Sequence, residues 1–133
     1  MSFLLDTHAF LWSVFEPARL GERSRAVLVD PGNDVFVSAV TFWEISLKAG
    51  LGKLKLEGCR PESLLGAART QGFQLLPLSP EDACIFHNLP RTQHKDPFDR
   101  MLIWQAIRGS HTLITHDSGI RRAYRAHRLV TLW

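Results

Sequence analysis

Four acidic side chains stand where a sheet of parallel strands would bring them together. Two closely follow short apolar runs, and two fall in the first turns of predicted helices; they are Asp6, Glu44, Asp99 and Asp117. Carboxylates held a few ångströms apart repel one another unless a cation neutralises them. An all-oxygen ligand set suits Mg²⁺ or Mn²⁺, and no spaced His and Cys pattern argues for zinc. A metal held this way keeps several of its waters, one of which can attack a phosphodiester.

Each of these acids also fits a purely structural role. Asp6 and Asp117 stand where helix N-caps are expected, and the segment 41–44, with Thr41 and Glu44 at its ends, fits a capping box. In the segment 96–99, Asp96 fits the N-cap and Asp99 the third helical position, which the helix dipole favours. Asp96 is therefore either a fifth metal ligand or only a cap. Lys48 can pair with Glu44 one helical turn away.

The elements that must position these acids alternate along the chain. Short apolar runs bounded by turn residues predict strands at 3–5, 35–37, 74–78, 112–115 and 129–132. Helices are predicted around 9–12 and over 41–48, 61–71, 80–88, 96–108 and 118–127. The helix over 96–108 is the clearest, because Pro97 lies just inside its start and Gly109 just past its end. Alternating strands and helices indicate an α/β fold with a parallel sheet, whose ligands bind beyond the carboxyl ends of the strands.

Length and composition predict one ordinary globular domain over residues 1–133. The 133 residues are 45% hydrophobic and 22% charged, far from the composition of disordered chains. The first residues lack a basic lead-in, and no apolar run is long enough for a membrane span. Cys59 and Cys84 have no metal-ligand spacing. These features favour a cytoplasmic protein that does not associate with a membrane.

Positive charge is concentrated in the last third of the chain. Residues 91–133 hold eight Lys and Arg against three Asp, a local charge of +5, within a whole-chain charge of +3. With those acids occupied by a cation, the remaining basic surface suits a phosphate backbone. The alternative is a solvated helix face that happens to be rich in arginine.

Five short sequence blocks, most of them around the acids, follow one another in a recognisable order. The blocks are Leu4 to His8, Ser38 to Lys48, Leu89-Pro90, His94 to Arg100 and Thr115 to Asp117. Together they resemble the motif blocks of PIN-domain nucleases, and most closely the VapC-like toxins with a "WEI…K" and a "DPFDR" block. The likeness covers essentially the whole chain. Lys95 stands where relatives often carry arginine.

The resemblance implies a fold, a site and a set of partners. It implies a PIN-like fold, with a central parallel sheet flanked by helices on both faces. It implies that Asp6, Glu44, Asp99 and Asp117 are the catalytic, metal-binding quartet for Mg²⁺ or Mn²⁺. The activity implied is hydrolysis of RNA that leaves a 5′-phosphate, by the toxin of a type II toxin-antitoxin pair. A cognate antitoxin and a homodimer are the expected protein partners.

Residues beside the motifs are expected to support the metal ligands or to contact the RNA. They are Thr7, Lys48, His94, Arg100, Thr115 and His116. A histidine beside such a motif more often supports a ligand than acts as a general base. The aromatic side chains are expected in the core, with Trp12 or Trp43 as candidates for a dimer contact; the set is Phe10, Trp12, Phe42, Trp43, Phe98 and Trp104.

Other functions fit the same pattern less well. A housekeeping or DNA-directed nuclease would use the same chemistry, and the sequence offers no discriminator. A phosphate-accepting signalling domain needs two adjacent acids after the first strand, whereas Asp6 is followed by Thr7. A catalytically inactive RNA-binding relic is disfavoured because the whole quartet is present.

Overall fold

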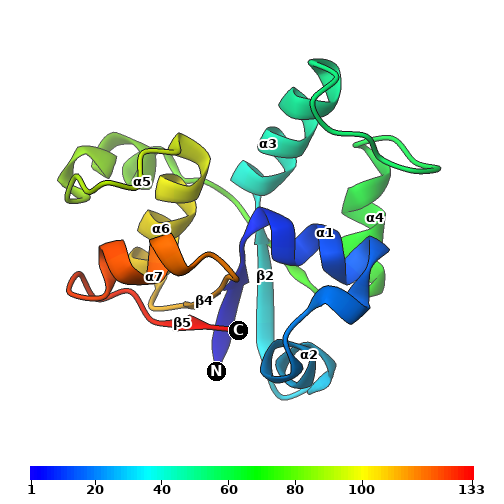
Figure 1. The fold of residues 1–133 in the computed structure, drawn as a ribbon, viewed down its shortest axis with the longest axis horizontal. Helices are drawn as coiled ribbons and strands as arrows, with labels where there is room; N and C mark the ends of the chain where they lie inside the picture. Colours follow the sequence, from blue (N-terminus) through cyan, green and yellow to red (C-terminus); the bar gives the residue numbers. More distant parts are fainter.

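Five parallel strands form one sheet through the centre of the protein, in the order β3-β2-β1-β4-β5. The computed structural model describes residues 1–133, and Figure 1 shows its strands between two groups of helices. The strands are β1 (Ser2–Leu5), β2 (Asp34–Ser38), β3 (Gln74–Leu76), β4 (Thr112–Ile114) and β5 (Thr131–Leu132). In the register, Phe3 of β1 lies opposite Val35 of β2, and Leu4 lies opposite Leu113 of β4. The predicted α/β fold with a parallel sheet is confirmed.

Helices cover both faces of this sheet. They are α1 (Thr7–Phe15), α2 (Glu22–Val29), α3 (Ala39–Gly50), α4 (Ser63–Thr70), α5 (Pro80–Cys84), α6 (Pro97–Gly109) and α7 (Ser118–Tyr124). Short 3₁₀ turns lie at Pro17–Arg19 and Phe86–Asn88. In Figure 1, α1, α2 and α4 lie on one side of the strands, and α5, α6 and α7 lie on the other. None of these helices is both long enough and apolar enough to cross a membrane.

The two layers follow from the alternation of side chains along the strands. Phe3 and Leu5 of β1 belong to a core shared with α1, α3 and α4, whereas Leu4 belongs to a second core shared with α6 and α7. Successive side chains of a strand point to opposite faces, so one apolar strand supplies both cores. The central strand is therefore held from both sides, and the loop that follows it starts from a fixed point.

The sequence misses one helix and misjudges the extent of others. No element was predicted between 13 and 34, yet α2 forms there, and its packing on the core uses few side chains, among them Val27 and Leu28. The helix predicted over 80–88 breaks at Ile85 into α5 and a 3₁₀ turn. The helix predicted over 61–71 is shorter, at Ser63–Thr70.

The end of α6 lies one residue further along the chain than predicted. Gly109 was predicted just past the helix, but α6 includes it, and the cap is Ser110 in the left-handed conformation (φ 54°). A Cβ at Gly109 would lie 2.4 Å from His111 Nε2. Glycine therefore leaves room for the His111 ring, and its φ is not positive.

The prediction that the aromatic side chains are core residues is only partly correct. Phe10 and Trp104 are buried, but Trp43 exposes 62% of its surface. Its ring packs edge-on against Phe98 with 5.1 Å between ring centroids. Leu47, one turn further along α3, and Leu51, the residue just after this helix, are also exposed.

Candidate active site

The middle of the sheet is where the carboxylates meet. Asp6 follows β1 directly, and Asp117 lies three residues after β4, the strand that pairs with β1. β2 and β3 extend the sheet on the β1 side of this pair, and β5 extends it on the β4 side. A parallel sheet opens a crevice beyond the carboxyl ends of its strands at such a switch in strand order.

Asp6 and Asp117 are helix N-caps as well as pocket residues. Asp6 Oδ1 accepts the Ala9 N–H (2.8 Å), and Asp117 Oδ1 accepts the N–H groups of Gly119 (2.7 Å) and Ile120 (3.2 Å). A pocket of about 320 Å³ is lined by Asp6, His8, Trp12, Asp99, His116 and Asp117. The structural and the functional interpretations are thus compatible, because capping with one oxygen fixes the direction of the whole carboxylate.

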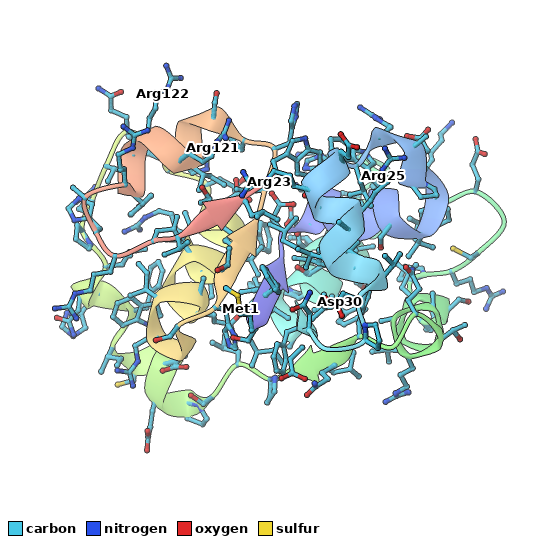
Figure 2. All side chains as sticks on the ribbon, turned by 90° about the horizontal axis from the view of Figure 1, so that it is seen from below. Met1, Arg23, Arg25, Asp30, Arg121 and Arg122 are labelled. Carbon is cyan, nitrogen blue, oxygen red and sulfur yellow. The ribbon has the colours of Figure 1, made fainter.

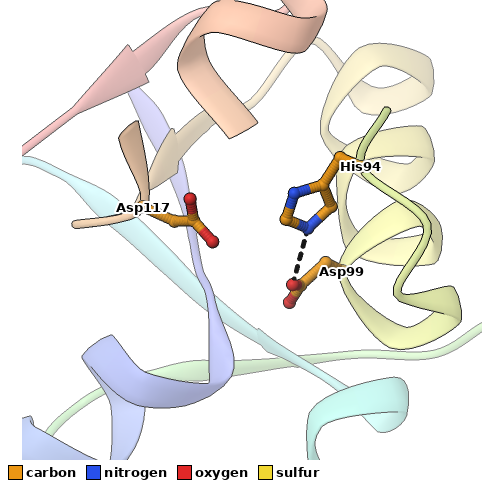
Figure 3. Close-up of side chains that lie close together, drawn as sticks. All are labelled: His94, Asp99 and Asp117. Carbon is orange, nitrogen blue, oxygen red and sulfur yellow. Dashed lines mark hydrogen bonds and ion pairs between the residues drawn. The ribbon is translucent and has the colours of Figure 1, made fainter. Parts of the chain in front are cut away.

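The two acids at the start of α6 are used differently. Asp96 is exposed and is the N-cap, with its Oδ1 accepting the Asp99 N–H (2.9 Å). Asp99 points to the pocket, where its Oδ2 accepts a hydrogen bond from His94 Nε2 (2.9 Å). His94, Asp99 and Asp117 each offer a ligand atom, and these atoms lie within 4.8 Å of one another (Figure 3).

Glu44 is buried on α3 and is paired on both oxygens. The Thr7 hydroxyl donates to Oε1 (2.6 Å), and the Lys48 ammonium donates to Oε2. The predicted capping box at 41–44 is wrong, because Ser38 caps α3 through the Val40 N–H and Thr41 is buried inside the helix. Glu44 is therefore held by tertiary contacts and by its i,i+4 partner, and it does not cap its own helix.

Mutual repulsion and burial shape the electrostatics of the site. Burial raises the pKa of Asp6 from 3.8 to about 6, and the charge of Asp99 adds to the rise against the hydrogen bonds from Thr115 and Ala9. Burial also raises the pKa of Asp99, and the Asp96 and Glu44 charges act in the same direction. The Glu44 carboxylate raises the pKa of Lys48, so this ammonium stays charged. Such a set of under-neutralised carboxylates suits a divalent cation.

Of the neighbouring residues named from the sequence, His116 and Thr115 lie close to the carboxylates and Arg100 does not. His116 lines the pocket and packs on Trp133 (4.9 Å between ring centroids), while the Thr115 hydroxyl accepts the Asp117 N–H (3.1 Å). Arg100 turns away from the carboxylates. Its guanidinium donates to the Tyr124 hydroxyl (3.2 Å) and to the Leu89 carbonyl (3.3 Å). This arginine of the "DPFDR" block ties α6 to α7 and to the loop after the 3₁₀ turn.

Sequence reasoning undervalued one residue, His94. It was named only as a neighbour of the acidic blocks, and the ligand set was predicted to be all oxygen. The structure places its ring next to Asp99 and near Asp117, with a ligand atom of each residue within 4.8 Å of the others. A signal was available, because a histidine five residues before Asp99 ends a loop at the same sheet edge. Spacing alone does not say which way a loop side chain points.

Comparison with known proteins agrees with this geometry. The PIN domain family matches residues 3–126. Ribonuclease VapC22 of Mycobacterium tuberculosis is 28% identical over 135 residues, which cover 98% of this chain and 97% of the relative. The structure of VapBC2 from Rickettsia felis, bound to a DNA fragment from their promoter, has a TM-score of 0.70 at 16% identity and covers 100% of this chain and 99% of that one. FitAcB from Neisseria gonorrhoeae has a TM-score of 0.60 at 25% identity, over 100% and 97%.

The fold and the carboxylate pocket define an α/β protein with a candidate metal site at its sheet switch point. The chain belongs to the PIN-domain family. The resemblance drawn from the ordered motif blocks is therefore confirmed.

Proposed function

We propose that this protein is a metal-dependent endoribonuclease and the toxin of a type II toxin-antitoxin pair. One observation carries the proposal: Asp6, Asp99 and Asp117, from three separate segments, line one pocket at the carboxyl edge of the sheet. Glu44 does not line this pocket, but its charge acts on Asp99. The full-length relative named a ribonuclease supports RNA as the substrate.

Asp6, Glu44, Asp99 and Asp117 are the proposed ligand set for Mg²⁺ or Mn²⁺. A bound cation supplies an activated water and stabilises charge on the attacked phosphate. The helix caps of Asp6 and Asp117 fix where their free oxygens point. The Thr7 hydroxyl donates to Glu44, and the Lys48 ammonium balances the charge of this carboxylate. Asp96 supports the set by fixing the start of α6, on which Asp99 stands.

The basic residues of α7 are the proposed track for the RNA backbone. Arg121, Arg122 and Arg125 are exposed and form no ion pair, and Figure 2 shows Arg121 and Arg122 extending outward from α7. Arg122 also lines a hollow of about 620 Å³ with His94, whose ring is hydrogen-bonded to Asp99. Unpaired arginines beside a hydrolytic site suit the phosphates on either side of the scissile bond.

A cognate antitoxin and a second copy of the chain are the proposed protein partners. The antitoxin is supported by the related VapBC2 structure, an antitoxin complex bound to a DNA fragment from their promoter. Exposed Trp43 and Leu47 on α3, with Leu51 just after the helix, give the chain an apolar strip suited to self-association. Light scattering at micromolar concentration should give the mass of a dimer, and a monomer mass would contradict this part. The proposed location of the protein and of these partners is the cytoplasm.

Cleavage of a labelled RNA, with a DNA of the same sequence beside it, tests the proposal. We expect RNA cleavage in Mg²⁺ or Mn²⁺, none in EDTA, recovery when metal is added back, and a 5′-phosphate on the product. Full activity in EDTA would contradict the metal-dependent chemistry.

The alternative is a housekeeping or DNA-directed nuclease on the same fold. Equal or preferred cleavage of the DNA strand would favour it. A short neighbouring reading frame encoding a DNA-binding protein would instead favour the toxin role.

A further inference from the structure

A second hollow, which the proposed chemistry does not use, adjoins the carboxylate pocket. It has a volume of about 410 Å³ and is lined by α1, by the 3₁₀ turn after it and by residues 54–57. His8 and Trp12 line both this hollow, called here the α1 hollow, and the carboxylate pocket. A group bound in the α1 hollow would be the immediate neighbour of a phosphate held at the carboxylates.

The lining of the α1 hollow suits a flat, uncharged group with polar edges. Half of its residues are apolar, and these are Leu11, Trp12, Phe15, Leu54 and Leu56. Its charged side chains are two cations and two anions, so they give no net charge; they are Arg19, Lys55, Glu16 and Glu57. A phosphate is bound by an excess of positive charge, which α7 provides instead. A nucleobase has an apolar face and hydrogen-bonding edges, so it is the part of an RNA that fits this lining.

Arg19 is held over the Trp12 ring in this hollow. Its guanidinium carbon lies 4.3 Å from the ring centroid, and its Nη1 donates to Glu16 Oε2 (3.0 Å). Even so, 58% of the Arg19 side chain is exposed. A guanidinium is planar and stacks on aromatic rings. With one side on Trp12, the other side of the guanidinium is left for a second flat group.

Trp12 gives Arg19 a fixed support. Its side chain is partly buried and packs against the core that α1 shares with β1. The rings of Trp133 and His116 pack on it at steep angles, with 5.6 Å and 6.0 Å between centroids. His8 packs on it as well, at 5.8 Å. A group that stacks on Arg19 is therefore fixed in position relative to the carboxylates.

We propose that the α1 hollow binds the base of a nucleotide next to the cleaved phosphodiester, and that this base stacks on Arg19 over Trp12. The inference rests on the proposed ribonuclease function and deepens it, because it assigns a position to a base as well as to phosphates. Bases of single-stranded RNA stack on aromatic rings and on arginine planes in many proteins. Because α1 and α7 lie on opposite sides of the strands (Figure 1), the base on α1 and the phosphates on α7 do not compete for space.

The fluorescence of short RNAs that carry one fluorescent purine analogue tests the stacking directly. The analogue is quenched when it stacks, and it is moved one nucleotide at a time across the cleavage site that the wild type uses. Binding is measured with the full chain in EDTA, where the proposed metal chemistry does not cut the RNA. In the wild type, the analogue at one position next to the cleavage site should be quenched on binding.

Arg19→Lys keeps the positive charge and removes the planar group on which the base stacks. It should remove most of the quenching at that position and weaken RNA binding by about fivefold or more. An RNA that lacks the base at that position should bind the wild type more weakly by a similar factor. For Arg19→Lys, the loss of the same base should change the affinity far less.

Arg23→Lys is the matched control, because it makes the same exchange at an exposed arginine of α2 outside the α1 hollow. It should keep the quenching and the RNA affinity of the wild type. Equal quenching and equal RNA affinity in the wild type and in Arg19→Lys would overturn the inference and leave the hollow to a protein partner. Cleavage of RNA by the wild type in Mn²⁺ would then still uphold the nuclease proposal. A wild type that neither binds nor cleaves RNA would overturn both proposals.

Discussion

Asp6 shows how one side chain carries structural and chemical demands together. Its Oδ1 caps α1, yet the carboxylate is buried and close enough to Asp99 for its pKa to rise to about 6. Keeping it ionised at neutral pH costs about 3 kcal/mol of folding stability, at roughly 1.4 kcal/mol per pKa unit. Without a cation, the site is therefore destabilised by a buried negative charge, to which the Asp99 charge adds.

Asp6→Asn should stabilise the metal-free protein at pH 7, by an amount on the order of 1–3 kcal/mol. Asparagine caps a helix as well as aspartate does, so the cap survives while the buried charge is removed. The folded state binds the Asp6 proton more tightly than the unfolded state does. The stability of the wild type relative to Asp6→Asn should therefore be highest below about pH 4, fall as the pH rises to about 6, and stay low above it.

Urea denaturation of both proteins in EDTA, from pH 4 to pH 8, measures this difference. Adding Mn²⁺ at pH 7 should stabilise the wild type and have little effect on the variant. A difference between the two proteins that does not change with pH would show that Asp6 titrates normally in the folded chain.

At the scale of elements, the helix starts determine the geometry of the site. Each of α1, α6 and α7 begins at an aspartate cap, and these are Asp6, Asp96 and Asp117. The sequence predicted these positions because apolar runs, turn residues and Pro97 mark where strands end and helices begin. It did not predict α2, because that helix buries little surface, nor the direction of His94, because a loop side chain is set by tertiary packing. The exposure of Trp43 was likewise not predictable from its type.

Asp96→Ala should destabilise the protein by about 0.5–2 kcal/mol through the lost cap. Asp96→Ser keeps a capping oxygen and removes the charge, so its stability should stay close to that of the wild type. Thermal unfolding of the two variants, together with their RNA cleavage rates, separates the roles of the side chain. Lost cleavage in Asp96→Ser with an unchanged melting temperature would make Asp96 a fifth metal ligand.

At the scale of the whole molecule, negative charge gathers in the carboxylate pocket and positive charge on a basic ridge formed by Arg121, Arg122 and Arg125 of α7. The carboxylates lie at the switch point of the sheet, and the exposed arginines lie on α7 next to it. Part of the excess positive charge of residues 91–133, that of α7, thus lies near His94 and Asp99. A polyanion drawn to the ridge would bring its phosphates within reach of the pocket.

Replacing Arg121 and Arg122 with glutamine should weaken RNA binding and reduce its dependence on salt. For single-stranded RNA the slope of log K against log salt should become shallower by about 1.4, since each lost phosphate contact contributes about 0.7. Filter binding between about 50 and 200 mM salt measures this slope. Both variants carry Asp99→Asn, so that the RNA is not cleaved during the measurement. The charge-matched control is Arg60→Gln with Arg69→Gln, both exposed near α4. Equal slopes in the two double variants would place the RNA elsewhere.

The most direct test of the account is the single-turnover rate of RNA cleavage by Asp99→Asn at saturating Mn²⁺, beside the wild type and Asp96→Ser. Even an outer partner of a metal ligand typically contributes 10–100-fold to activity, so loss of a ligand should cost more than about 100-fold. Asp99→Asn should therefore be almost inactive with an unchanged fold, while Asp96→Ser cleaves at close to the wild-type rate. Normal cleavage by Asp99→Asn would contradict the carboxylate site on which the account rests.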